Sequence, residues 1–265
     1  MDGALTELPP PTPSLSRDED AVARRLVDTP PRGSFRPELV EGLPPPARDW
    51  LMHAIAVGTP LWRTTRLLMH GSIKVGERWL PFEAMQIHAP GKGMLWKARA
   101  RMMGLPIVGH DLYAEGRGEM RWKMLGLVPV ARGEGPDIDR STRGRLAAET
   151  AVMVPTWLVG PHVTWTGEGP RAAVAHFTID GEPFDIRLQL GDGGALRGVS
   201  FLRWGAPLPG DAFGLHPFGC EVQEEQTVAG LTVPRRMRAG WFFGGPRFES
   251  EGEFFRATVD SLRPL

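Results

Sequence analysis

The stretch that decides the fold is residues 136–155, PDIDRSTRGRLAAETAVMVP, which lies between two long runs of strand-like sequence. Its pattern predicts an α-helix over residues 137–154 that ends before Pro155, because proline has no amide proton and its ring blocks the preceding helical turn. No other segment after Trp62 has a comparably helical pattern. A lone helix in a strand-rich chain has to pack against the sheet, so if the sheet curves, the helix closes one side of a cavity.

The segments on both sides of this helix alternate between apolar and polar residues with a period of two, which is typical of β-strands. Residues 94–103 show the pattern clearly, with Trp96 and Met102 on one face and Lys97 on the other. Short turns separate the runs and predict antiparallel hairpins. The expected strands cover about residues 63–75, 78–89, 94–103, 107–115, 118–131, 162–167, 171–180, 182–190, 195–204, 218–229, 231–243 and 252–260.

Two dipeptide turns also predict strand register. Asp180-Gly181 suits a type I′ turn, which places Phe177 opposite Phe184 and His176 opposite Asp185. A second hairpin turns at Ala229-Gly230. It places opposite charges across the two strands, in the pairs Glu224–Arg235 and Glu221–Arg238.

These patterns predict a mainly β (α+β) fold, with a large curved antiparallel sheet or half-barrel of about 11–12 strands. The central helix packs on the concave side. Two helices precede the sheet, at residues 17–27 after a capping box from Ser16 to Glu19, and from Pro45 to before Gly58. We expect a proline-rich segment with a short helix over residues 1–42, disordered over residues 1–15, and a single β domain over residues 43–265.

Composition limits the class of partner. The chain has 265 residues, with 31 Lys plus Arg, 31 Asp plus Glu and a net charge of zero, which disfavours nucleic acid. The single Cys220 excludes an intramolecular disulfide and fits a reducing compartment. The sequence shows neither a signal peptide nor a run of roughly 18 apolar residues, so we expect no transmembrane segment and a cytoplasmic location. The sequence allows a lipid-like small molecule as a ligand and leaves protein partners unknown.

No motif in the chain has the spacing of a catalytic or metal site. The histidines are scattered, without an H-x-x-x-H or H-E-x-x-H pattern, and Cys220 has no base beside it. Glycine-rich stretches such as residues 191–194 connect strands and do not precede a helix, as a phosphate-binding loop does. The sequence therefore predicts no catalytic residue, no metal and no cofactor.

Methionine and tryptophan gather in the first five expected strands. Seven of the 11 methionines lie there, at Met69, Met85, Met94, Met102, Met103, Met120 and Met124. Methionine is flexible and polarizable, so it suits surfaces that accept varied apolar ligands, although it also fills ordinary cores. Either interpretation remains open. The candidate ligand contacts from this group are Trp96, Met102, Met120, Trp122 and Met124.

Arg145 and Glu149 are four residues apart, so both lie on one face of the predicted helix. Glu149 falls between Leu146 and Met153 on the apolar stripe, which predicts partial burial. A buried pair has two possible roles. It either pins the helix to the sheet, or it forms the polar end of an apolar pocket in which Arg145 meets an acidic head group.

Asp111 and Tyr113 share a face of the expected strand 107–115, just before a turn at Gly116. A buried tyrosine needs a partner for its hydroxyl, which Asp111 or the helix can supply. Both residues join the candidate ligand contacts. Asp111 and Glu149 are also the two carboxylates best placed to act as a general acid or base if the protein is an enzyme.

Several features of the sequence resemble a bacterial family of unknown function. They are RWLPFEAMQIHAPGKGMLWKARARMMGLPIVGHDLYAEGRGEMRWKMLGLVPV over residues 78–130, Arg145-x-x-x-Glu149 followed by Pro155, PFGCEVQEEQTVAGLTVPRRMRAGW over residues 217–241, and EGEFFRA over residues 251–257. The resemblance covers about residues 43–260 and implies no established activity. The overall pattern, with Gly230-Leu-Thr-Val-Pro234 opening a late strand, is also similar to the half-barrels of lipoprotein carriers, a similarity of architecture alone.

Three functional hypotheses follow from the sequence. The leading one is a non-catalytic binding protein that holds an apolar or amphipathic, lipid-like molecule in a cavity between the curved sheet and the helix. The first alternative is an enzyme of small-molecule metabolism that uses Glu149 or Asp111 as acid or base. The second is a structural or interaction module with the proline-rich N-terminus as a tether.

Overall fold

The computed structural model describes residues 13–27 and 30–265. Residues 1–12, from the segment expected to be disordered, and residues 28 and 29, from the expected linker, lie outside the described residues. The chain begins with α1 (Arg17–Val27), a 3-10 turn η1 (Pro37–Leu39) and α2 (Pro45–Ala54). The sequence predicted both α-helices at these positions.

A single antiparallel sheet of 13 strands forms the body of the fold. The first half contains β1 (Thr65–Val75), β2 (Arg78–Ala89), β3 (Gly93–Met102), β4 (Leu105–Ala114), β5 (Arg117–Met124) and β6 (Val128–Glu134). The second half contains β7 (Thr164–Gly167), β8 (Ala172–Ile179), β9 (Glu182–Leu190), β10 (Leu196–Gly205), β11 (Gly214–Val228), β12 (Leu231–Trp241) and β13 (Glu253–Pro264). Short 3-10 and π turns lie at η2 (Pro155–Leu158), η3 (Asp192–Gly194) and η4 (Phe248–Gly252).

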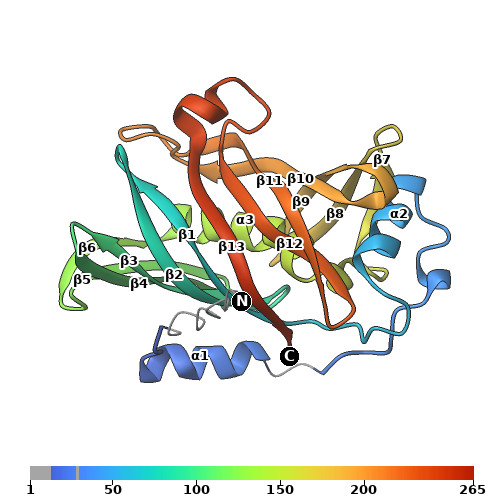
Figure 1. The fold of residues 1–265 in the computed structure, drawn as a ribbon, viewed down its shortest axis with the longest axis horizontal. Helices are drawn as coiled ribbons and strands as arrows, with labels where there is room; N and C mark the ends of the chain where they lie inside the picture. The colour runs from blue at the N-terminus through green and yellow to red at the C-terminus, as the bar shows by residue number, and fades with distance from the viewer. Residues whose placement is uncertain (1–12, 28–29) are drawn as a thin grey trace, which may run out of the picture.

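The two halves meet at the centre of the sheet, where β1 pairs with β13. The strand order leaves β6 and β7 as the outer edges. α3 (Pro136–Met153) and η2 connect these edges, so the helix crosses from one side of the sheet to the other. Figure 1 shows α3 behind the central strands, enclosed between the green strands of the first half and the yellow and orange strands of the second. The mainly β fold with a central helix is thus confirmed.

Turn chemistry explains much of the register. Asp180 and Gly181 have φ values of 48° and 78°, the left-handed conformation that a type I′ turn requires at both positions. The turn pairs Phe177 with Phe184 and His176 with Asp185, as the sequence predicted. Glu221 also lies opposite Arg238, as predicted.

Two details of the sheet differ from the sequence-based expectation. The expected strand 118–131 is two strands, β5 and β6, because Leu125 and Gly126 turn the chain with φ values of 55° and 72°. The sheet therefore has 13 strands and not 11 or 12. In the strand register Glu224 lies opposite Arg236 and not Arg235, because a β-bulge shifts the register next to it. The predicted ion pair with Arg235 still forms, at 2.7 Å.

Glycines allow α3 to approach the sheet closely. A Cβ atom at Gly118 in β5 would lie 2.6 Å from the Ile138 carbonyl oxygen of the helix, so no side chain fits there. The helix has its own glycine, Gly144, where a Cβ would lie 3.3 Å from the Phe201 ring on β10. Glycine inside a helix destabilises it by about 0.5–1 kcal/mol relative to alanine, so its presence is explained by this contact. Leu146 and Met153 of α3 are buried in the main core.

The convex side carries α1, which packs on β2 and β3. Leu26 of the helix and Leu95 of β3 belong to a second, smaller core on this side. Glu19 caps the helix, because it accepts a hydrogen bond from the Ser16 amide at 2.7 Å, which confirms the predicted capping box. The same carboxylate forms an ion pair with Lys97 at 2.7 Å and fixes α1 to the sheet.

Candidate functional site

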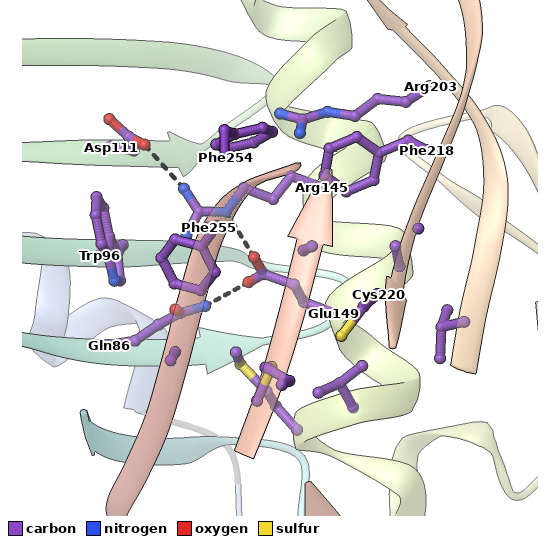
Figure 2. Close-up of a pocket in the computed structure, with 18 of the residues that line it drawn as sticks. Gln86, Trp96, Asp111, Arg145, Glu149, Arg203, Phe218, Cys220, Phe254 and Phe255 are labelled. Atoms are coloured by element: carbon purple, nitrogen blue, oxygen red, sulfur yellow. Dashed lines mark hydrogen bonds and ion pairs between the residues drawn. The ribbon is translucent and has the colours of Figure 1, made fainter. Parts of the chain in front are cut away.

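A cavity of about 150 Å³ lies between α3 and the sheet. Its wall is mostly apolar and includes Met69 of β1, Met237 of β12, Met153 of α3, and aromatic rings from β10, β11 and β13. An engineered cavity of about 150 Å³ lined by apolar side chains binds benzene, so this volume is large enough for a small apolar group. Figure 2 shows the polar side chains that enter the cavity at one side, which are Gln86, Asp111, Arg145, Glu149 and Arg203.

Arg145 ties the helix to the first half of the sheet. Its Nε donates to Glu149 one turn further along α3 at 2.6 Å, and its Nη1 donates to Asp111 of β4 at 2.8 Å. The guanidinium also lies 5.1 Å from the centre of the Trp96 ring. The three charged side chains are between 15% and 22% exposed, so the partial burial expected from the helical face is confirmed.

Glu149 extends this network to β2. Its second oxygen accepts a hydrogen bond from the Gln86 side-chain amide at 2.6 Å, and His88 lies 3.7 Å away. Burial alone would raise the pKa of Glu149, but the charge of Arg145 and the hydrogen bonds from Arg145 and Gln86 lower it below its ordinary value. Burial lowers the pKa of His88 to about 4, although the Glu149 charge opposes this shift. At neutral pH the carboxylate is charged and the imidazole is neutral.

Two buried polar atoms in the cavity wall have no hydrogen-bond partner in the structure. They are Oε1 of Gln86 and Nε1 of Trp96, one an acceptor and the other a donor. Both residues are no more than 2% exposed. An unsatisfied buried polar group costs about 1–3 kcal/mol, and both atoms lie beneath the surface of the wall with almost no accessible area of their own.

Arg203 is the second cation of the cavity and differs from Arg145. Its Nε donates to the Ser141 carbonyl of α3 at 3.3 Å, and its guanidinium lies 4.6 Å from the Phe218 ring and 5.1 Å from the Trp241 ring. Within the described residues no carboxylate forms an ion pair with it. Burial and the neighbouring charge of Arg145 lower the pKa of Arg203 to about 10, so it remains protonated at neutral pH.

A second polar cluster joins the two halves of the sheet across α3. The Tyr113 hydroxyl of β4 donates to Asp180 in the β8–β9 turn and accepts from Arg143 of the helix at 2.6 Å. Arg143 also pairs with Glu182 of β9 at 2.7 Å. Burial, together with Asp180, raises the pKa of Tyr113 to about 12. The helix thus supplies one partner of this tyrosine, as expected, but Asp180 rather than Asp111 supplies the other.

The structure brings only part of the predicted set together. Trp96, Asp111, Arg145 and Glu149 line the cavity. Five candidates lie outside its wall, namely Met102, Tyr113, Met120, Trp122 and Met124. Trp122 stands directly behind the wall, since its ring centre is 5.6 Å from that of Trp96 and its Nε1 donates to Asp111 at 3.2 Å. A role in ligand binding for the five outer residues stays a prediction.

Sequence reasoning missed several lining residues. Three methionines line the cavity. Met69 belongs to the group that the sequence indicated, whereas Met153 and Met237 come from elements far from that group in the chain. Arg203 was not singled out, because in sequence it is one residue of an alternating strand. Only the pairing of β10 with β11, together with the contact between Arg203 Nε and the α3 backbone, reveals its position.

The geometry defines the class of this protein as an antiparallel half-barrel crossed by a helix, with a mostly apolar cavity beneath the helix. The chain matches the family of unknown function DUF6544 over residues 33–250, and it belongs to that family. The expected family resemblance is confirmed. No functionally curated protein matches the sequence. None of the helices within residues 13–27 and 30–265 is long and apolar enough to cross a membrane.

Two solved structures are similar in outline. One is a LolA superfamily protein from Nitrosomonas europaea, with 7% identity, a TM-score of 0.42 and coverage of 83% of this chain and 92% of the other. The other is a DUF1329 family protein from Desulfovibrio piger, with 14% identity, a TM-score of 0.34 and coverage of 77% and 86%. Similarity at this level carries no functional argument.

Proposed function

We propose that this chain is a non-catalytic binding protein for an apolar or amphipathic, lipid-like molecule, which it holds in the cavity beneath α3. The observation that supports this most is the mostly apolar cavity itself, which a few polar side chains, among them Arg145 and Arg203, border. Ligand sites are typically apolar with a few oriented polar groups. This wall has that composition.

The cavity alone is small for such a ligand, since ligand pockets usually measure about 300–1,000 Å³. A shallower hollow of about 670 Å³ adjoins it and shares the Phe201 and Phe218 rings as a wall. The hollow lies along β8 to β11 and reaches Gly144 of the helix. Side-chain rotation of the two rings would connect the spaces and provide room for an extended chain.

The polar network beside the cavity supports binding better than acid–base catalysis. Glu149 accepts hydrogen bonds from Arg145 and Gln86, and its lowered pKa keeps it charged. Asp111 accepts from Arg145 and from the Trp122 indole. A general acid or base needs a pKa near the working pH and room for a substrate proton. Both oxygens of each carboxylate already accept a hydrogen bond, so neither carboxylate is free to take up a substrate proton.

Titration with N-phenyl-1-naphthylamine tests the proposal, because this neutral dye fluoresces in apolar sites. We expect saturable binding that Ala148→Phe abolishes, since Ala148 lines the cavity and is only 8% exposed. The same substitution at the exposed Ala212 is the matched control and should leave binding unchanged. If Ala148→Phe does not fold, Ala239→Leu places a smaller obstruction in the same wall.

Two results would contradict the proposal. The first is the absence of saturable dye binding to the wild-type chain. The second is binding that persists unchanged in folded Ala148→Phe or Ala239→Leu, because the dye would then occupy another part of the surface.

A further inference from the structure

The two arginines of the cavity differ in how much of their charge is already matched. Arg145 faces two carboxylates, Glu149 and Asp111, both within 2.8 Å. An additional anion at Arg145 would therefore meet net negative charge. Arg203 has no such partner within the described residues, and its only hydrogen bond there goes to the uncharged Ser141 carbonyl.

The surroundings of Arg203 leave the far edge of its guanidinium available. The Phe218 and Trp241 rings lie 4.6 Å and 5.1 Å from it, and Nε is occupied by the helix backbone. Figure 2 shows the guanidinium directed into the pocket, toward Phe254 and above Arg145. The two Nη groups can then donate together, in the fork geometry that matches a carboxylate or phosphate.

The same position adjoins apolar surface on both sides. Phe218 and Phe201 contact the cavity and the adjoining hollow, so a head group at Arg203 leaves its chain next to either space.

We propose that Arg203 binds the anionic head group of a single-chain amphiphile whose apolar chain occupies the cavity. This inference rests on the proposed function, and it adds the charge of the ligand and the residue that recognises it. It also moves head-group recognition from Arg145, where the sequence placed it, to Arg203. Arg145 then serves to hold the helix on the sheet.

Competition for the bound dye tests the inference at pH 8, with dodecanoate and dodecanol as matched anionic and neutral competitors. A charge-assisted hydrogen bond contributes enough for roughly a tenfold preference, so dodecanoate should displace the dye at about one tenth of the dodecanol concentration. Arg203→Met should remove this preference while the dye itself still binds. Arg203→Lys, which keeps the charge without the fork, should retain part of it.

Arg247→Met is the matched control. Arg247 also lies against an aromatic ring, 3.8 Å from the centre of the Phe242 ring, and pairs with Glu251 at 2.7 Å, but it lines neither the cavity nor the hollow. This variant should keep the full preference for dodecanoate. Acetate forms a second arm and should not compete, because it has the head group without the chain.

The outcomes separate this inference from the proposed function. If the dye never binds, the proposed function fails and the inference fails with it. If the dye binds but the wild-type chain does not distinguish dodecanoate from dodecanol, or if Arg203→Met keeps the distinction, only the inference fails. Competition by acetate at equal concentration would show a site for small anions and would also overturn it.

A different observation concerns the outside of the molecule. Six large apolar side chains are exposed at one corner of the sheet, and we call them the hairpin-tip patch. They come from the β3–β4 turn and the first residue of β4, from the β5–β6 turn, and from the edge strand β6. They are Met103, Leu105, Leu125, Leu127, Val128 and Val130. Met103 is 83% and Leu127 is 77% exposed. The two turns lie side by side, because the Leu125 amide donates to the Pro106 carbonyl at 2.8 Å.

Two of these residues occupy backbone conformations that large side chains rarely adopt. Met103 and Leu125 have φ values of 50° and 55°, where asparagine, aspartate or glycine is normally found. Met103 is 83% and Leu125 is 53% exposed, so burial within this chain does not account for large apolar side chains at these positions. Their presence indicates a contact with another surface.

Charge identifies the kind of surface. Arg99, Arg101 and Lys123 stand next to the patch on β3 and β5, and none of them forms an ion pair within the described residues. No acidic residue occurs in residues 98–110 or 120–133. Apolar side chains surrounded by unpaired cations complement an anionic bilayer, where each cation near the surface contributes about 1 kcal/mol. We infer that the hairpin-tip patch docks on an anionic membrane surface.

Co-sedimentation with vesicles tests this docking. The wild-type chain should sediment with vesicles of phosphatidylcholine mixed with phosphatidylglycerol, and far less with phosphatidylcholine alone or at high salt. The double variant Met103→Asp/Leu127→Asp should lose binding at least about tenfold, and Arg101→Glu/Lys123→Glu should lose the preference for anionic vesicles. Val57→Asp is the control, since Val57 is 64% exposed beyond α2, away from the patch.

The substituted side chains are exposed, so the variants should remain folded, which circular dichroism checks. Absence of wild-type sedimentation with anionic vesicles would overturn the inference. So would unchanged binding by the double aspartate variant. Dimerisation of the wild-type chain that the aspartates abolish, without vesicle binding, would assign the patch to self-association instead.

Discussion

Replacement of Arg145 by methionine tests whether this side chain pins α3 to the sheet. The substitution keeps most of the apolar volume but leaves the Glu149 and Asp111 carboxylates beside the cavity without their cation. Removing one partner of a buried ion pair lowers the free energy of unfolding by about 3–5 kcal/mol. Because these side chains retain 15–22% exposure, we expect the lower end of that range, roughly 3 kcal/mol. A domain of this size loses about 2–4 °C in Tm per kcal/mol, so the expected decrease is about 6–12 °C.

The stability lost in Arg145→Met should depend on pH in a defined direction. In the wild-type chain the pKa of Glu149 is lower in the folded than in the unfolded state, so this residue stabilises the fold above the ordinary pKa of a glutamate, and the contribution is lost as the pH falls through the folded value. Without Arg145 burial dominates and raises the folded pKa above that of the unfolded chain. The stability difference between Arg145→Met and wild type, measured by urea denaturation, should therefore narrow as the pH falls from neutrality toward the ordinary glutamate pKa of about 4.3.

Two comparisons can refute the reasoning. The triple variant Asp111→Asn/Arg145→Met/Glu149→Gln removes the charges together and should recover most of the lost stability. Arg187→Met, which breaks an exposed pair with Glu168, should change the free energy of unfolding by about 1 kcal/mol or less. If Arg145→Met resembles Arg187→Met, or if the triple variant is the least stable, Arg145 does not act as a clasp.

Three further predictions concern the other polar contacts. In the wild-type chain, stability should fall by about 3 kcal/mol between pH 6.5 and pH 4, because the unfolded His88 imidazole binds a proton in this range and the buried one, with a pKa of about 4, does not. His88→Gln should remove this decrease, which urea denaturation at a series of pH values measures. Tyr113→Phe should lower stability by about 1–2 kcal/mol and speed amide hydrogen exchange around Asp180, whose partner it removes, whereas unchanged exchange would contradict a link between the sheet halves. Glu19→Gln should accelerate exchange in α1 by releasing Lys97, with the rest of the sheet unaffected; equal protection of α1 in both proteins would argue against this anchor.

The fold was predictable because its determinants are local. Asp180-Gly181 permits one tight turn and so fixes its register, and Pro155 ends the central helix. The sequence did not predict the turn between β5 and β6, because the turn contains two leucines and Gly126 is its only typical turn residue. The bulge beside Glu224 has no sequence pattern either.

The site was predictable only where one element determines it. The helical spacing of Arg145 and Glu149 implied a partly buried pair, and the structure confirms it. Asp111 as the shared partner and Gln86 as the second donor depend on how β2 and β4 meet the helix. The position of Arg203 depends on a contact between β10 and α3 that no sequence period reveals.

Native mass spectrometry of the chain incubated with dodecanoate tests the central claim most directly, namely that the space beneath α3 holds an amphiphile. We predict a complex with one bound dodecanoate for the wild-type chain and for Ala212→Phe, and none for folded Ala148→Phe, which obstructs the cavity. An equal amount of complex in wild type and Ala148→Phe, or no complex in either, would contradict the account.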